Sequence, residues 1–84
     1  MKIYRVQCYK IRTYSREKIT AGHLGNFTTK EKALNAINEW EKKYSNSHHI
    51  EKKENDGNTI GYRIEKAPYF YEEIEFCIYE EEVQ

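Results

Sequence analysis

The segment 26–45, NFTTKEKALNAINEWEKKYS, predicts one amphipathic helix, and the fold follows from it. Thr28 precedes Glu31 by three residues, a spacing typical of a capping box that fixes the start of a helix. Apolar residues then recur at intervals of three and four, and charged or amide side chains fill the remaining positions. We therefore expect a helix over about 29–45 that packs one stripe against a sheet. The stripe consists of Ala33, Ala36, Ile37, Trp40 and Tyr44, flanked by Leu34.

Segments in which apolar and polar residues alternate lie on both sides of this helix and predict strands. Residues 2–12 form the first, and residues 18–24 supply a short second strand that would return as a hairpin. After the helix, residues 48–66 predict a hairpin and residues 72–81 a last strand. The sequence thus predicts an α+β fold with a four- or five-stranded, mainly antiparallel sheet and one helix on one of its faces.

The hairpin after the helix has its turn near Gly57, and the turn type sets the register. A two-residue turn would place Ile50 opposite Arg63. A three-residue loop at 55–57, with Gly57 in the left-handed conformation, places Ile50 opposite Tyr62 instead and keeps the apolar side chains together. We expect the second arrangement.

The length and composition predict one small domain. A chain of 84 residues buries only about 60% of its unfolded surface, so we expect residues 1–84 to share one thin core. Apolar runs are too short for a membrane span or a signal peptide, so we expect a cytoplasmic protein without membrane contact. Cys8 and Cys77 are predicted to be reduced thiols, and a disulfide between them is the alternative.

The charges are distributed unevenly along the chain, although their sum is zero. Residues 1–66 carry 14 basic and 8 acidic side chains, whereas residues 67–84 carry six glutamates and no cation. Two interpretations remain open at this point. The acidic last strand either lies beside the basic first strand as its counter-charge, or forms an acidic edge that binds a basic partner.

The sequence contains none of the motifs that would predict catalysis, a metal or a cofactor. His48 and His49 are neighbours in a strand, so their side chains point to opposite faces and do not share a metal ion. Two glycines in the segment 22–30, GHLGNFTTK, precede a helix N-terminus and offer only a weak phosphate site. We therefore expect a protein that is not an enzyme and holds no cofactor.

Protein binding is the function that the remaining residues favour. Three consecutive aromatic residues at 69–71 cannot all enter a thin core, and exposed rings beside carboxylates serve as contact anchors. The predicted partner-binding residues are Tyr69, Phe70, Tyr71, Glu72, Glu73 and Glu75. A single helix covers only one face of the sheet, so we also predict a homodimer. It would pair either the exposed faces, with Tyr9, Cys77 and Tyr79 at the interface, or the edge strands.

Nucleic-acid binding is the alternative function. It would use the basic first strand and exposed tyrosines, which can stack on bases. The six glutamates of the last strand argue against it, because they would cancel the attraction of the basic residues for phosphate.

The helix opening at 27–34, FTTKEKAL, resembles the F-[ST]-[ST]-x-E-x-A-L opening of small uncharacterised proteins from phages, prophages and Gram-positive bacteria. The resemblance is confined to this region of the chain and transfers no functional residue. It implies a stoichiometric inhibitor or modulator of a host protein, such as a defence or nucleic-acid-processing factor. Together with the glutamates, it predicts a host partner with a basic surface.

Overall fold

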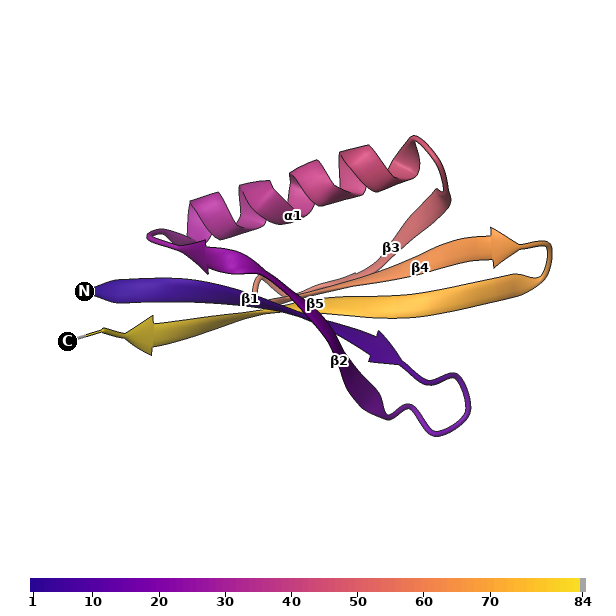
Figure 1. The fold of residues 1–84 in the computed structure, drawn as a ribbon, viewed down its shortest axis with the longest axis horizontal. Coiled ribbons are helices and arrows are strands. Elements are labelled where there is room, and N and C mark those ends of the chain that lie inside the picture. The colour runs from indigo at the N-terminus through magenta and orange to yellow at the C-terminus, as the bar shows by residue number, and fades with distance from the viewer. Residues whose placement is uncertain (84) are drawn as a thin grey trace.

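The computed structural model describes residues 1–83 and shows an antiparallel sheet with one helix (Figure 1). The strands follow the order β2-β1-β5-β4-β3, and every neighbouring pair is antiparallel. The predicted α+β class is confirmed, with five strands within the described residues. The elements are β1 (Lys2–Ile11), β2 (Lys18–Phe27), α1 (Lys30–Ser45), β3 (His49–Asn55), β4 (Thr59–Ala67) and β5 (Phe70–Glu82).

The helix begins one residue later than the capping box predicts. Thr29, not Thr28, is the N-cap, and its hydroxyl accepts a hydrogen bond from the amide of Lys32 at 3.1 Å. Strand β2 runs to Phe27, whose side chain packs on the core, and Thr28 therefore connects strand to helix. Either threonine has the chemistry of a cap, and the end of β2 decides which one serves.

The core lies between α1 and the face of the sheet that the helix covers. Helix residues Ala33 and Ile37 are fully buried, as the predicted stripe requires. Trp40 is half-buried and contacts the ring of Phe76 at a centroid distance of 4.8 Å and that of Tyr62 at 5.2 Å. The sheet contributes Val6, Ile60, Tyr62, Ile64, Ile74, Phe76 and Ile78.

The β3–β4 register differs from the predicted one by two residues. Ile50 lies opposite Ile64, not Tyr62, although it remains on the same face of the sheet. Asn55 pairs with Ile60, so four residues, 56–59, lie between the paired positions, and the register shifts again between Lys52 and Glu54. The carboxylate of Asp56 accepts hydrogen bonds from the amides of Asn58 and Thr59 at 2.9 and 2.7 Å and holds this loop. The turn closed by the Asp56 side chain forms in place of the predicted three-residue loop at 55–57. Gly57 has the predicted left-handed φ, 91°.

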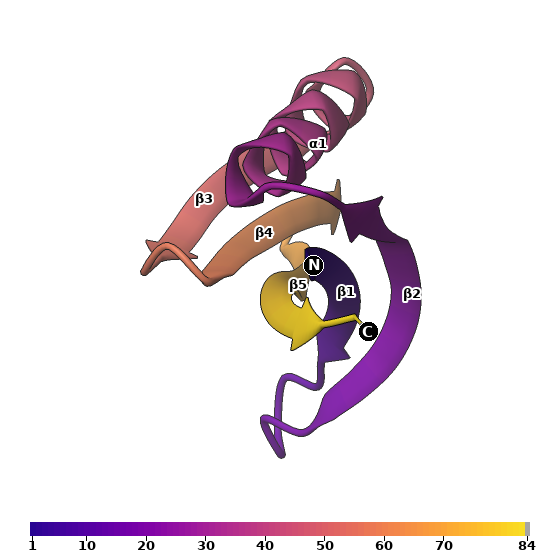
Figure 2. The ribbon, with the colours of Figure 1, turned by 90° about the vertical axis from the view of Figure 1, so that its left-hand side faces the viewer.

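The β1–β2 hairpin reaches away from the helix. Figure 1 and Figure 2 both show α1 on one side of the sheet and the β1–β2 loop on the opposite side. The pairing shifts register twice, at Val6/Gln7 and at Cys8/Tyr9. Such bulges increase the local twist of a strand pair. Ile11 at the end of β1 pairs with Glu73 near the start of β5, so the loop end of the hairpin lies beside the turn that joins β4 to β5, and both loops line one hollow.

Candidate functional site

Exposed aromatic side chains gather where the β1–β2 loop meets the β4–β5 turn. We call Tyr14, Tyr69, Phe70 and Tyr71 the aromatic end. Tyr14 is fully exposed, Tyr69 is 98% exposed, Phe70 60% and Tyr71 40%. All four line a hollow of about 360 Å³, together with Thr13, Arg63 and Glu73. The structure thus brings four of the six predicted partner-binding residues, 69–71 and Glu73, into one hollow.

The turn at the aromatic end holds Tyr69 in a strained backbone conformation. Ala67 pairs with Phe70, so Pro68 and Tyr69 form a two-residue turn. Tyr69 has a φ of 64°, the left-handed region that glycine usually supplies after a proline in such turns. A non-glycine residue there costs roughly 1–2 kcal/mol, and the exposed ring makes no packing contact that offsets this cost. Strain of this kind concentrates at binding sites.

The glutamates next to the aromatic end pair with cations of the same chain. Nζ of Lys10 lies 3.4 Å from Oε2 of Glu72, and Nη1 of Arg16 lies 2.6 Å from Oε2 of Glu73. Strand β5 lies between β1 and β4 and is therefore not an edge strand. Further along β5, Lys2 pairs with Glu80 and Arg5 with Glu81. The arrangement agrees with the counter-charge interpretation and not with an acidic edge.

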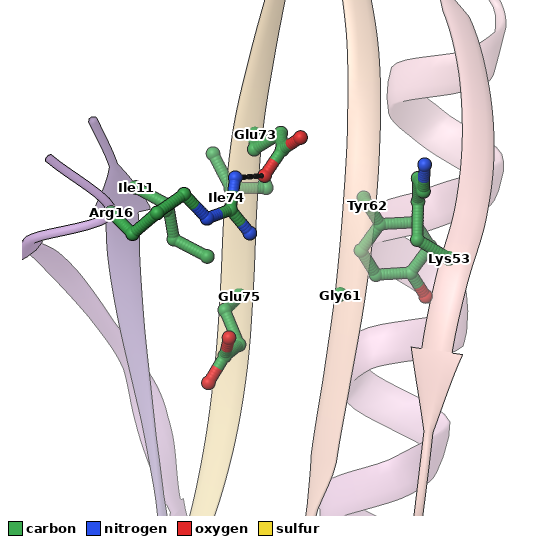
Figure 3. A pocket seen from close by; sticks show the side chains of 8 residues that line it. All are labelled: Ile11, Arg16, Lys53, Gly61, Tyr62, Glu73, Ile74 and Glu75. Carbon is green, nitrogen blue, oxygen red and sulfur yellow. Dashed lines mark hydrogen bonds and ion pairs between the residues drawn. The ribbon is translucent and has the colours of Figure 1, made fainter. Parts of the chain in front are cut away.

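Glu75 lies apart from the aromatic end, in a second pocket of about 350 Å³ (Figure 3). Only 4% of this residue is exposed, and its carboxylate accepts a hydrogen bond from Nζ of Lys18 at 2.6 Å. Gly61 lies opposite Glu75 in the β4–β5 pairing and leaves space beside it. Figure 3 also shows the Arg16–Glu73 ion pair at the rim of this pocket. Both carboxylates of this pocket are thus paired with cations of the same chain.

The predicted dimer-interface residues share the face of the sheet opposite the helix, as the alternation requires. The hydroxyls of Tyr9 and Tyr79 lie 2.9 Å apart, and the guanidinium of Arg5 lies 5.0 Å from the centre of the Tyr79 ring. The hydrogen bond to Tyr9, with a smaller effect of burial, raises the pKa of Tyr79. Cys77 is only 8% exposed and offers little surface to a second copy. This face is more polar than the sequence suggested.

The cysteines remain separate thiols. Cys77 lies opposite Gln7, and Cys8 lies opposite Phe76, so the two sulfurs are on opposite faces of the sheet and the disulfide alternative is wrong. Burial raises the pKa of both thiols, which keeps them protonated at neutral pH and poor as nucleophiles.

The described residues contain no cluster of three or more His, Cys, Asp or Glu that could hold a metal ion. His48 stacks on the ring of Tyr44 at 4.5 Å and contacts the hydroxyl of Ser47 at 2.9 Å, so its ring is in contact with its own chain. Within residues 1–83, no helix has the length and apolar character that a membrane crossing needs.

Sequence reasoning missed three residues of the hollow, Thr13, Tyr14 and Arg63. Tyr14 lies in a polar loop whose position relative to β5 the sequence does not reveal. The guanidinium of Arg63 lies 4.2 Å from the centre of the Tyr71 ring, and its Nε is buried without a hydrogen-bond acceptor. The sequence pattern could have placed Arg63 on the face of β4 opposite the core, two residues from Gly61 and on the same face as Glu73 of β5.

The fold and the hollow together define a small α+β domain with an aromatic surface at one end of its sheet. Comparison with protein-family models, curated proteins and solved structures found no match.

Proposed function

We propose that this chain is a non-catalytic protein-binding module that holds its partner through the aromatic end. The strained, fully exposed Tyr69 is the observation that carries the proposal. The fold could relieve this strain with glycine, and an exposed ring contributes nothing to the core. A tyrosine at this position is accounted for by a contact outside the chain, since large rings fill pockets on partners and dominate interface energies.

The two pockets support binding and not catalysis. The hollow at the aromatic end is lined mainly by rings, and the Glu75 pocket contains charges that pair with one another. The thiol of Cys77 donates a hydrogen bond to Glu75 at 3.4 Å, but Cys77 does not line the pocket, and burial and the neighbouring carboxylate raise its pKa, so it is a poor nucleophile.

The nucleic-acid alternative is less well supported by the contacts. The cations of β1 that would attract phosphate are already engaged, with Lys2 on Glu80, Arg5 on Glu81 and Lys10 on Glu72. Neutralised cations release few counterions on binding and add little affinity for a phosphate backbone.

The role of the glutamates in this proposal is secondary. Glu72, Glu73 and Glu75 are held by Lys10, Arg16 and Lys18, so a basic partner would have to displace internal cations. The rings at 69–71 are free of that competition. The resemblance of the helix opening to phage proteins supports a host protein as the partner, acting in defence or nucleic-acid processing.

Affinity capture from a bacterial lysate, followed by surface-plasmon kinetics on the captured protein, tests the proposal. Tyr69→Ala and Phe70→Ala should speed dissociation at least tenfold at unchanged melting temperature, because truncating an anchoring ring typically costs about 2 kcal/mol or more. Asn38→Ala, on the exposed side of α1, is the matched control and should bind like the wild type.

Two results would contradict the proposal. The first is equal binding by the wild type and both ring variants. The second is retention of the protein on DNA or heparin with a steep loss at higher salt, which would favour the nucleic-acid alternative.

A further inference from the structure

Arg63 is a cation at the aromatic end without a carboxylate partner among the described residues. Its guanidinium stacks on Tyr71, and the hydrogen bonds and ion pairs found within residues 1–83 do not include it. The buried Nε has no acceptor, a rare state for a buried donor. The side chain is thus held by its ring contact, and no ion pair among the described residues compensates its charge.

Two carboxylates lie opposite Arg63 in the sheet, and neither forms an ion pair with it among the described residues. Glu51 lies opposite Arg63 in the β3–β4 pairing. Glu73 lies directly opposite Arg63 in the β4–β5 pairing, where opposite charges normally pair across strands. Nη1 of Arg16 binds that carboxylate instead, at 2.6 Å. Arg16 itself has a left-handed φ of 59°, so the β1–β2 loop adopts a strained conformation beside the residue that makes this contact.

The surroundings of Arg63 suit a carboxylate. A guanidinium presents parallel N–H donors that match two carboxylate oxygens, and stacking on a ring fixes the plane of that fork. The neighbouring rings of Tyr14, Tyr69 and Phe70 line the same hollow and offer exposed apolar surface to the residues that flank a bound acid. A carboxylate side chain of a partner would therefore meet a directed guanidinium, and its apolar neighbours would meet exposed rings.

We propose that the hollow receives an acidic side chain of a partner protein, paired with Arg63 and flanked by apolar residues that pack on the rings. The inference rests on the proposed protein-binding function and names the chemistry of the partner. It differs from the basic partner that the sequence predicts, because the glutamates responsible for that prediction are paired internally.

A carboxylate fits better than a phosphate group. A phosphate monoester carries nearly two negative charges at neutral pH. In the hollow it would lie beside the carboxylate of Glu73, and Arg63 would be the one cation there without an ion-pair partner among the described residues. A single negative charge matches the single uncompensated guanidinium. A lysine or arginine of a partner would be repelled by Arg63 and by Arg16.

Selection from a library of random dodecapeptides on the immobilised wild-type chain, with Tyr69→Ala as the counter-selection, tests the inference. We expect the selected peptides to share an aspartate or glutamate next to an aromatic or aliphatic residue. Their dissociation constants are then measured by fluorescence anisotropy at low and at high salt.

Variants at the ion pairs separate the proposed contact from a general effect of charge. Arg63→Gln should weaken the selected peptides by roughly tenfold or more, because a hydrogen-bonded charge pair is lost. Arg63→Lys should recover only part of the affinity, since lysine lacks the planar fork. Arg16→Gln should also weaken binding, because it frees Glu73 to pair with Arg63. Lys43→Gln, an equal change of charge on the exposed side of α1, should have no effect.

The outcomes distinguish the two proposals. Selected peptides without an acidic residue, or peptides that bind Arg63→Gln as tightly as the wild type at matched melting temperature, overturn the inference and leave the binding module intact. Failure to select any peptide that distinguishes the wild type from Tyr69→Ala overturns both.

Discussion

The contact between Trp40 and the sheet is where a single substitution should weaken the fold most visibly. The indole ring contacts three other rings, those of Tyr44, Tyr62 and Phe76, at centroid distances of 5.0, 5.2 and 4.8 Å. It therefore joins α1 to β4 and to β5 at once. Trp40→Ala removes these contacts and leaves a cavity that the sheet, paired on both sides of β5, cannot close.

The expected loss lies at the lower end of the range for such truncations. Removing a fully buried tryptophan side chain typically costs 3–5 kcal/mol, and the indole here is half-buried, so we expect about 3 kcal/mol. The whole domain should be stable by roughly 4–13 kcal/mol. At about 4–8 °C per kcal/mol for a domain of this size, the melting temperature should fall by roughly 12–24 °C.

Thermal unfolding followed by far-UV circular dichroism measures this change. Trp40→Phe keeps a ring in the same place and should lose only about 1 kcal/mol. Asn38→Ala on the exposed side of the same helix should stay within about 0.5 kcal/mol of the wild type. A melting temperature of Trp40→Ala within about 3 °C of the wild type would refute the packing of α1 against the sheet as described.

Three other predictions concern the two turns at Tyr69 and Asp56 and the face of the sheet opposite the helix. Tyr69→Gly should raise the melting temperature by several degrees, because glycine adopts the positive φ without strain, while partner binding is lost; a fall in stability would show that the ring packs on the fold. Hydrogen bonds from two backbone amides lower the pKa of Asp56, so its contribution to stability should be complete above the ordinary value of 3.8 and disappear as the pH falls through the lower folded-state pKa. The stability difference between the wild type and Asp56→Asn should shrink over that window, and a difference that does not change with pH would contradict this account. Light scattering at tens of micromolar should report a homodimer that Tyr79→Arg dissociates, and a wild-type monomer would exclude pairing of the face opposite the helix.

The edge strands of the sheet, β2 and β3, are poorly suited to form the predicted dimer. Strand β2 has two irregularities in its pairing with β1, and the segment 51–54 of β3 is a run of four charged residues, EKKE. Bulges and charges are two common devices that prevent edge strands from pairing with other chains. The face that carries Tyr9 and Tyr79 therefore remains the better candidate for an interface.

The sequence by itself determined the elements, because their signals are local. The apolar spacing of the helix stripe, the alternation in 2–12 and 72–81 and the left-handed glycine at 57 each depend on neighbours a few residues away. These expectations agree with the structure to within a few residues. The predictions of the helix cap and of the β3–β4 register were wrong for the same reason. In each case two local solutions, two threonines or two turns, have similar chemistry, and the ends of the flanking strands determine which one forms.

Only the tertiary structure decided the site. The order β2-β1-β5-β4-β3 places the acidic β5 in the centre of the sheet, next to the basic β1. The glutamates that the sequence suggested as a binding edge therefore form ion pairs with cations of the same chain. The same topology brings the β1–β2 loop beside the β4–β5 turn, so that Tyr14 and Tyr69 line one hollow. It also lets Arg16 form an ion pair with Glu73, which otherwise lies opposite Arg63. These contacts join residues more than fifty positions apart. Their geometry depends on twist and strand order, which no local pattern in the sequence encodes.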